Sequence, residues 1–221
     1  MIWHPDPQTQ AAAVAHPLPL AAIVPAPQFP GRNFAGGSWN HRVINQHWPA
    51  PNFRAGPAAI IAALAAGNNL EGLAMVVSWG TMWRQPDSIY GHRHLPDIHD
   101  KIDLARESIA ATNCINNAWM ILTDPNPGGL GWSPVLSSKF LHFLCRSLGE
   151  VQDPPVAIDN AVILNAVWPA WRALHYPQFS PNNWCGHTLA AYLRYMTAIQ
   201  SWATLREWTT TEFEATVFSE Y

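Results

Sequence analysis

The chain has 221 residues, which is enough for one domain with a sizeable hydrophobic core. Charged residues make up 12% of it and aromatic residues 11%, with 12 tryptophans, a globular composition that excludes a largely disordered chain. The formal net charge of −3 lacks the basic excess typical of nucleic-acid-binding domains, so tight nonspecific binding to DNA is not expected, although a local arginine face stays compatible with this charge.

The cysteines and the N-terminal residues indicate the compartment. Cys114, Cys145 and Cys185 lie far apart without a C-x-x-C pair, which indicates neither a metal ribbon nor a disulfide framework. A secretory signal starts with basic residues, and this chain has none before Arg32. No apolar run is long enough to cross a membrane. We therefore expect a cytoplasmic protein with no membrane association.

Residues 1–35 form a segment rich in proline and alanine. Because proline lacks the amide hydrogen that a helix interior needs, this segment predicts an N-terminal arm that wraps the domain or is poorly ordered. It has room for one helical turn at most, between Ala11 and Ala15. Residues 36–221 are expected to form a single helical domain, and the alternation typical of β-strands is missing from 36–56.

Two helices are predicted next along the chain. One begins at Pro57 and ends before Gly67, and the next runs from about Leu70 to Trp79. A cluster of small and aromatic residues marks the end of the second helix, namely Ser78, Trp79, Met82 and Trp83. The cluster has two interpretations: the wall of a pocket that stacks on an extruded base, or core aromatics at a corner of the chain.

A polar segment with several histidines comes next, including His92, His94 and His99. These side chains are possible metal ligands, but their spacing matches no established motif, and a polar loop leading into a helix explains them equally well. The helix is expected to start at Asp97 or Asp100 and to run to about Leu122. Three asparagines on it face either a binding cleft or water: Asn113, Asn116 and Asn117.

The next predicted helix contains a lysine in apolar surroundings. Ser133 suits its N-cap, Pro134 its first position and Gly149 its end, and apolar residues over most of the circumference predict a buried helix. Lys139 would lose hydration there, which disfavours the charged form of its amine. A neutral amine is a nucleophile that forms a Schiff base with an aldehyde or a sugar C1′.

A loop with two prolines leads from this helix to Asp159, which is predicted to cap the following helix. A carboxylate at a helix N-terminus stays ionised, and cleavage of a glycosidic bond needs an ionised carboxylate beside the developing sugar cation. Each residue taken singly also has a simpler explanation. Lys139 would extend its amine to solvent, and Asp159 would serve only as a helix cap.

The rest of the chain is predicted to be helical. One helix follows Asp159 to about Trp168, a long helix covers 183–205, and a last helix covers 212–218 with Thr210 or Thr211 as its N-cap. Because no strand is predicted, the expected class is all-α.

The segment S-S-K-F-L-H-F-L, followed by P-P-V-A-I-D, resembles the helix-hairpin-helix DNA glycosylases, most closely the 8-oxoguanine glycosylase group and its shorter prokaryotic relatives. The separation of Lys139 and Asp159 (159 − 139 = 20 positions) is close to that family's pattern. By this resemblance Lys139 matches the nucleophilic lysine and Asp159 the catalytic aspartate. The family's hairpin has two glycines that bring amides to a DNA phosphate, and here Val135 and Ser137 stand in their places. The hairpin is therefore degenerate, and Ser137 and Ser138 are expected to contact the phosphate instead.

The resemblance implies a helical domain that removes a damaged or modified base from DNA, with possible cleavage of the strand at the abasic site and without a metal or organic cofactor. Candidate phosphate contacts are Arg84, Arg93, Arg146 and Arg172. An alternative is a non-catalytic DNA- or protein-binding subunit on the same fold, for instance in a defence or modification system, with a protein partner that supplies DNA affinity. The missing glycines and the negative charge favour it. A weaker alternative is a metal-dependent hydrolase that uses the three histidines.

Overall fold

The structure, a computed structural model, describes residues 3–22, 24–25, 32–34, 53–80, 95–149, 154–157 and 188–220. Most of these residues are helical, which confirms the all-α class. The described helices are α1 (Pro7–Ala15), α3 (Pro57–Ala65), α4 (Asn69–Gly80), α6 (Leu95–Thr112), α7 (Asn116–Thr123), α8 (Pro134–Ser147), α11 (Leu189–Leu205) and α12 (Thr210–Glu220). Within these ranges, no helix has the length and apolar character needed to cross a membrane.

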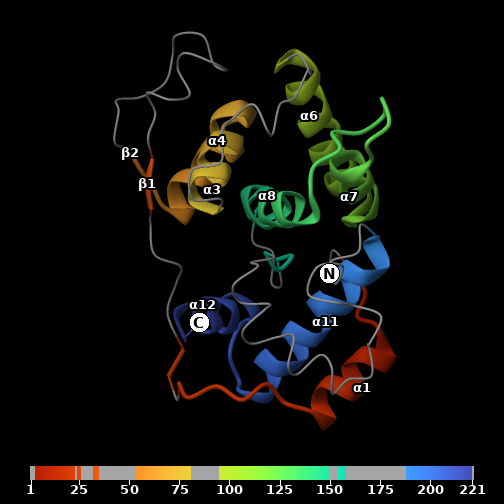
Figure 1. The fold of residues 1–221 in the computed structure, drawn as a ribbon. Helices are drawn as coiled ribbons and strands as arrows, with labels where there is room; N and C mark the ends of the chain where they lie inside the picture. Colours follow the sequence, from red (N-terminus) through yellow and green to blue (C-terminus); the bar gives the residue numbers. More distant parts are fainter. Residues whose placement is uncertain are drawn as a thin grey trace.

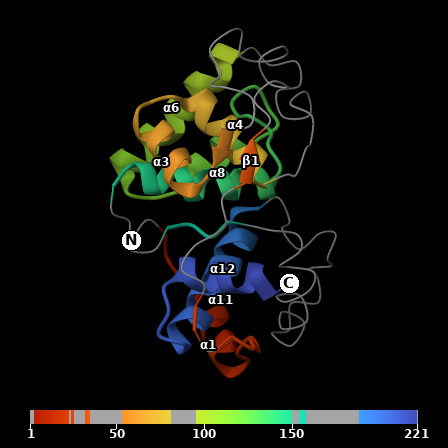
Figure 2. The same cartoon turned by 90° about the vertical axis from the view of Figure 1, so that its left-hand side faces the viewer.

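The helices form two groups that are stacked on each other. In one group α8 packs against α3, α4, α6 and α7, and in the other α11 packs against α1 and α12. Figures 1 and 2 both show residues 154–157 between the groups. Trp119 of α7 stacks on Tyr192 of α11 with ring centroids 4.2 Å apart, so a buried aromatic pair joins the two groups.

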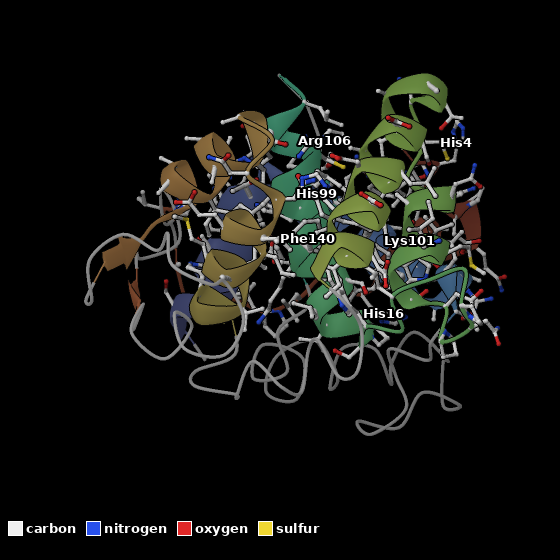
Figure 3. All side chains as sticks on the ribbon, turned by 90° about the horizontal axis from the view of Figure 1, so that it is seen from above. His4, His16, His99, Lys101, Arg106 and Phe140 are labelled. Atoms are coloured by element: carbon white, nitrogen blue, oxygen red, sulfur yellow. The ribbon has the colours of Figure 1, made fainter. Side chains whose placement is uncertain are left out.

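Helix α8 is the centre of its group and begins and ends as the sequence predicts. The Ser133 hydroxyl oxygen accepts a hydrogen bond from the amide of Leu136 at 3.3 Å, and Gly149 beyond the helix has a φ of +131°, which favours glycine. All residues from 136 to 145 are buried. Figure 3, seen from above, shows Phe140 of α8 between α4 and α6. The helix is therefore enclosed by its neighbours on every side.

Close packing between α3 and α4 fixes the position of α4 over α8. A Cβ atom on Gly72 would lie 2.4 Å from Leu64 Cδ2, so only glycine allows this approach. Arg106 of α6 donates hydrogen bonds to the Leu64 carbonyl, at 2.9 Å, and to the side chain of Asn69. These contacts join α3, α4 and α6 at the turn between the first two.

The structure divides the single helix predicted up to Leu122. Helix α6 ends at Thr112, and Asn113 has a left-handed φ of +48°, which asparagine tolerates better than most residues. Helix α7 then starts at Asn116. Asn113, Asn116 and Asn117 are all exposed.

The N-terminal arm contains more helix than the proline content predicts. Asp6 caps α1 by accepting a hydrogen bond from the amide of Thr9 at 2.8 Å, and Pro7 occupies the first turn, where no amide hydrogen is needed. The helix packs against α11, and Trp3 and Leu18 on either side of it are buried. The expectation of one turn at most was wrong, because the prolines stand at the helix start and not within it.

Three smaller corrections concern strands and helix starts. Arg32–Phe34 (β1) pairs antiparallel with Phe53–Ala55 (β2), a ladder too short to leave an alternating pattern in the sequence. Helix α11 begins at Leu189, later than predicted, because Thr188 is its N-cap. At α12, Thr209 and Glu212 form a reciprocal capping box, so neither Thr210 nor Thr211 is the cap.

Candidate active site

Lys139 lies in the middle of α8 with only 3% of its surface exposed. Its Nζ atom is 5.9 Å from the ring centroid of Trp79 on α4, within the range of a cation–π contact. The amine therefore does not extend to solvent, and the explanation of Lys139 as a solvated lysine was wrong. The structure instead brings the predicted nucleophile against one of the predicted pocket residues.

Trp79 belongs to an aromatic cluster between α4 and α8. Its ring meets Phe143 edge to face, with centroids 5.2 Å apart, and it is almost fully buried. This burial favours a core position at the end of α4. Ser78 lies on the same helix, although its side chain is not described, and Met82 and Trp83 lie outside the described residues. Their assignment to a base pocket stays a prediction.

Residues 154–157 form the loop that leads toward Asp159. They are buried, and their carbonyls accept hydrogen bonds from both groups of helices. The Pro155 carbonyl oxygen lies 2.8 Å from Nδ1 of His142 on α8. The Val156 carbonyl accepts a hydrogen bond from the Tyr192 hydroxyl of α11, also at 2.8 Å. Asp159 itself lies outside the described residues, so its catalytic role stays a prediction, but the backbone just before it has defined partners.

His142 is a buried histidine whose protonation state follows from its partners. A carbonyl only accepts hydrogen bonds, so Nδ1 must carry the hydrogen, and Nε2 is then the acceptor for Nη1 of Arg146 at 3.5 Å. Burial lowers the pKa of His142 to about 4, the bond to Pro155 opposes this shift, and the charge of Arg146 adds to it. The imidazole is therefore neutral near pH 7.

Neither His142 nor Tyr192 is predicted as a functional residue from the sequence. The available signal was the position of His142, three residues after Lys139 on the same face of a helix that is otherwise apolar. No such signal marks Tyr192, because its contact to Val156 joins residues 36 positions apart.

The three predicted DNA-binding residues on α8 are directed into the protein. Ser137 and Ser138 have no exposed surface, and the Ser138 hydroxyl donates to the Val135 carbonyl at 3.1 Å. Burial lowers the pKa of the half-buried Arg146, and Glu214 of α12 partly offsets this effect. These positions disfavour a direct phosphate contact by the two serines, and they give Arg146 a partner inside the fold.

Other reactive side chains of the described region have structural surroundings. Burial raises the pKa of the Cys145 thiol, so this cysteine is not an activated nucleophile. His99 pairs with Asp103 at 3.3 Å on α6, whereas His92 and His94 lie outside the described residues. No group of three metal-ligating side chains occurs within the ranges that the structure describes.

The comparisons with known proteins agree with the resemblance seen in the sequence. A model of the family described as "Putative 8-oxoguanine DNA glycosylase OGG-like protein" matches residues 54–218. No curated protein and no solved structure matches the chain. The matched range includes Trp79, Lys139, His142 and Tyr192, whereas α1 lies outside it. The match covers well over half of the sequence, so the chain belongs to this 8-oxoguanine DNA glycosylase OGG-like family.

Proposed function

We propose that the protein is a DNA N-glycosylase that uses Lys139 as its nucleophile and Asp159 as the assisting carboxylate. The observation that carries the proposal is the placement of Lys139, a lysine with 3% exposure held against Trp79 on a buried helix. Removing a lysine side chain from water is unfavourable unless it is held by specific contacts, so its burial at this position calls for an explanation. Membership of the glycosylase-like family supports the same role.

In the proposed reaction the amine of Lys139 attacks C1′ of the damaged nucleotide through its nitrogen lone pair. The Nζ–C1′ bond forms while the bond between C1′ and the base breaks, and the base leaves with that electron pair and takes up a proton. The ionised carboxylate of Asp159 stabilises the positive charge that develops on the sugar. Loss of a proton from nitrogen and opening of the sugar ring give a Schiff base. Removal of a C2′ proton from this species then expels the 3′-phosphate, which is the lyase step.

Borohydride trapping tests the proposal, because reduction makes the Schiff base permanent. The chain has only two lysines, so Lys101→Ala is a matched control for Lys139→Met, a variant that keeps an apolar side chain of similar length in the core. Duplexes that contain 8-oxoguanine, uracil, a modified cytosine or a preformed abasic site are the probes. We expect covalent complexes with the wild-type chain and with Lys101→Ala, and none with Lys139→Met. Trapping that persists in a folded Lys139→Met variant would exclude Lys139 as the nucleophile.

A second candidate function is a non-catalytic subunit that binds DNA or protein through the same fold. The burial of Ser137 and Ser138, and the internal contacts of Arg146, favour it because they remove predicted phosphate contacts. A preformed abasic site separates the two candidates, since it presents the sugar aldehyde without requiring base recognition. Failure of the wild-type chain to trap on this duplex would support the binding subunit.

A further inference from the structure

We propose that His142 and Tyr192 are positioning residues that hold residues 154–157 in place and thereby set the position of Asp159 relative to Lys139. The inference rests on the proposed function, because it concerns the geometry of that catalytic pair. It adds two residues that touch neither the sugar nor the base and that act through the backbone.

The chemistry of the 154–157 segment explains why these two side chains matter. Pro154 and Pro155 have no amide hydrogen, so the backbone here has few ways to bond other than through its carbonyl oxygens. His142 donates a hydrogen bond to the carbonyl of Pro155, and Tyr192 donates one to the carbonyl of Val156, each at 2.8 Å. All of these groups are buried, so water is not available to replace a lost donor.

The two donors come from opposite sides. His142 belongs to α8 in one group of helices, and Tyr192 belongs to α11 in the other. Residues 154–157, which lie between the two groups of helices, are therefore held by both groups (Figures 1 and 2). Asp159 follows Pro155 by four residues in the sequence (159 − 155 = 4), so in the proposed site these two hydrogen bonds hold the stretch of backbone that leads to the carboxylate.

A continuous set of buried contacts connects His142 to the lysine. The imidazole meets Phe143 edge to face at 5.0 Å, Phe143 meets Trp79 in the same way, and Trp79 lies under the amine of Lys139. His142 is also one turn from Lys139 on the same helix face. One buried cluster thus contacts both the nucleophile and the loop that leads to the carboxylate.

Both donors are held in the state that the role requires. Arg146 on the Nε2 side keeps the hydrogen of His142 on Nδ1, facing Pro155. Tyr192 stacks on Trp119, with the rings inclined by only 15°, and burial raises the pKa of its hydroxyl well above the ordinary value. The hydroxyl accordingly stays protonated and remains a donor over the whole range in which an enzyme would be assayed.

The role predicts that two activities respond differently to the same substitution. Release of the base depends on the carboxylate, which stabilises the sugar cation, whereas formation of a Schiff base at a preformed abasic site depends mainly on the amine. A displaced Asp159 should slow the first step far more than the second. A general loss of structure would slow both.

The test uses the full chain and compares His142→Leu and Tyr192→Phe with the wild type. His142→Asn is the rescue variant, because its side-chain amide can donate from nearly the position of Nδ1. Thr197→Val is the matched control: it removes a hydroxyl from α11 that accepts a hydrogen bond from the amide of Asp6 and donates one to the Leu193 carbonyl. Each variant is assayed for single-turnover release of a base that the wild type excises, and for trapping on the preformed abasic duplex.

We expect His142→Leu and Tyr192→Phe to slow base release by about tenfold or more while trapping stays within about twofold of the wild type. His142→Asn should recover most of the lost rate, and Thr197→Val should leave the ratio of the two rates unchanged. Tyr192→Phe keeps the aromatic stack on Trp119, so it carries the test even where His142→Leu fails to fold.

The outcomes separate the inference from the proposed function. A wild-type chain that neither releases a base nor traps on the abasic duplex would overturn both. A wild-type chain that does both, with a ratio unchanged in Tyr192→Phe and in folded His142→Leu, would overturn the positioning role alone. If base release, trapping and thermal stability all fell together in these variants, the two residues would have a structural role and no specific role in the site.

Discussion

At the scale of the residue, the buried imidazole of His142 should make stability depend on pH. Its pKa is about 4 in the folded chain and 6.5 ordinarily, so between these values the unfolded chain binds a proton that the folded chain does not. The free energy of unfolding therefore falls as the pH falls through this window, by about 3 kcal/mol in total for the 2.5-unit shift. Urea denaturation at several pH values between 7.5 and 5 measures the slope, which should be smaller in His142→Leu.

Two carboxyl groups with a lowered pKa titrate below the pH range of this measurement and do not affect the slope. Hydrogen bonds lower the pKa of Asp6 below 3.8 and of Glu212 below 4.5, so their stabilisation is present above those values and is lost only as the pH falls further. The difference between the wild type and His142→Leu above pH 5 thus isolates the histidine. Equal slopes in the two proteins would mean that His142 is not buried as a neutral imidazole.

The sequence predicts the individual reactive residues better than their partners. Lys139 stands out because it is a lysine in an apolar helix, and its burial follows from that pattern. The inward direction of Ser137, Ser138 and Arg146 depends on which faces of α8 are covered, and a helix that is covered on all sides gives no periodic signal. The partners of residues 154–157 come from distant parts of the chain and leave no local pattern.

At the scale of the element, the N-terminal arm is held on α11 by side chains that bond to its backbone. The indole nitrogen of Trp202 donates to the carbonyls of Ala13 and His16, each at 3.0 Å. Arg206 donates to the carbonyls of Leu20 and Ala22. The end of α1 and the extended segment after it are therefore bound to the C-terminal end of α11.

We expect Trp202→Phe to destabilise the protein by about 1–3 kcal/mol, because it keeps an aromatic ring but leaves two carbonyls without their donor. Urea denaturation measures the loss, and limited proteolysis should show faster cleavage after α1. Thr204→Val on the same helix removes only an exposed hydroxyl, which bonds within α11, and should change stability little. Equal stability of Trp202→Phe and the wild type would show that these bonds do not hold the arm.

Helix boundaries divide into those with a local cause and those without. Pro57, Ser133 and Gly149 mark their helix ends through their own chemistry, and these boundaries could be predicted. The break at Asn113 could not, since asparagine in a helix and asparagine in a left-handed turn look the same in one sequence. Helix α1 owes much of its stability to packing on α11, which single-segment patterns do not report.

At the scale of the whole molecule, much of the positive charge on the described residues is used internally. Side chains with a contact inside the protein include Arg106, Lys139, Arg146 and Arg206. The outer face of α6 adds exposed acidic residues, namely Asp97, Asp100 and Glu107. Together with the net charge of −3, this leaves few cations for phosphates among the residues that the structure describes.

We therefore expect the affinity for an abasic-site duplex to depend only weakly on salt, with a slope of log K against log salt no steeper than about −3, the value for about three phosphate contacts. The remaining candidates for these contacts are Arg84, Arg93 and Arg172, and their alanine variants should each weaken binding and flatten the slope by about one. Fluorescence anisotropy at several salt concentrations measures both quantities. Lys101→Ala, on the acidic helix α6, should leave the slope unchanged, and a slope near −8 in the wild type would contradict this distribution of charge.

The capped start of α8 has a consequence for how the protein would search a genome. Pro134 has no amide hydrogen, and the Leu136 amide already donates to Ser133, so neither of these two residues offers a free amide hydrogen to an approaching phosphate. Under the proposed function, fewer contacts to the sugar–phosphate backbone would shorten each encounter with undamaged duplex. Such a protein would dissociate readily from each undamaged site that it samples. Its dwell time at a lesion would come mostly from contacts to the extruded nucleotide and from the covalent step.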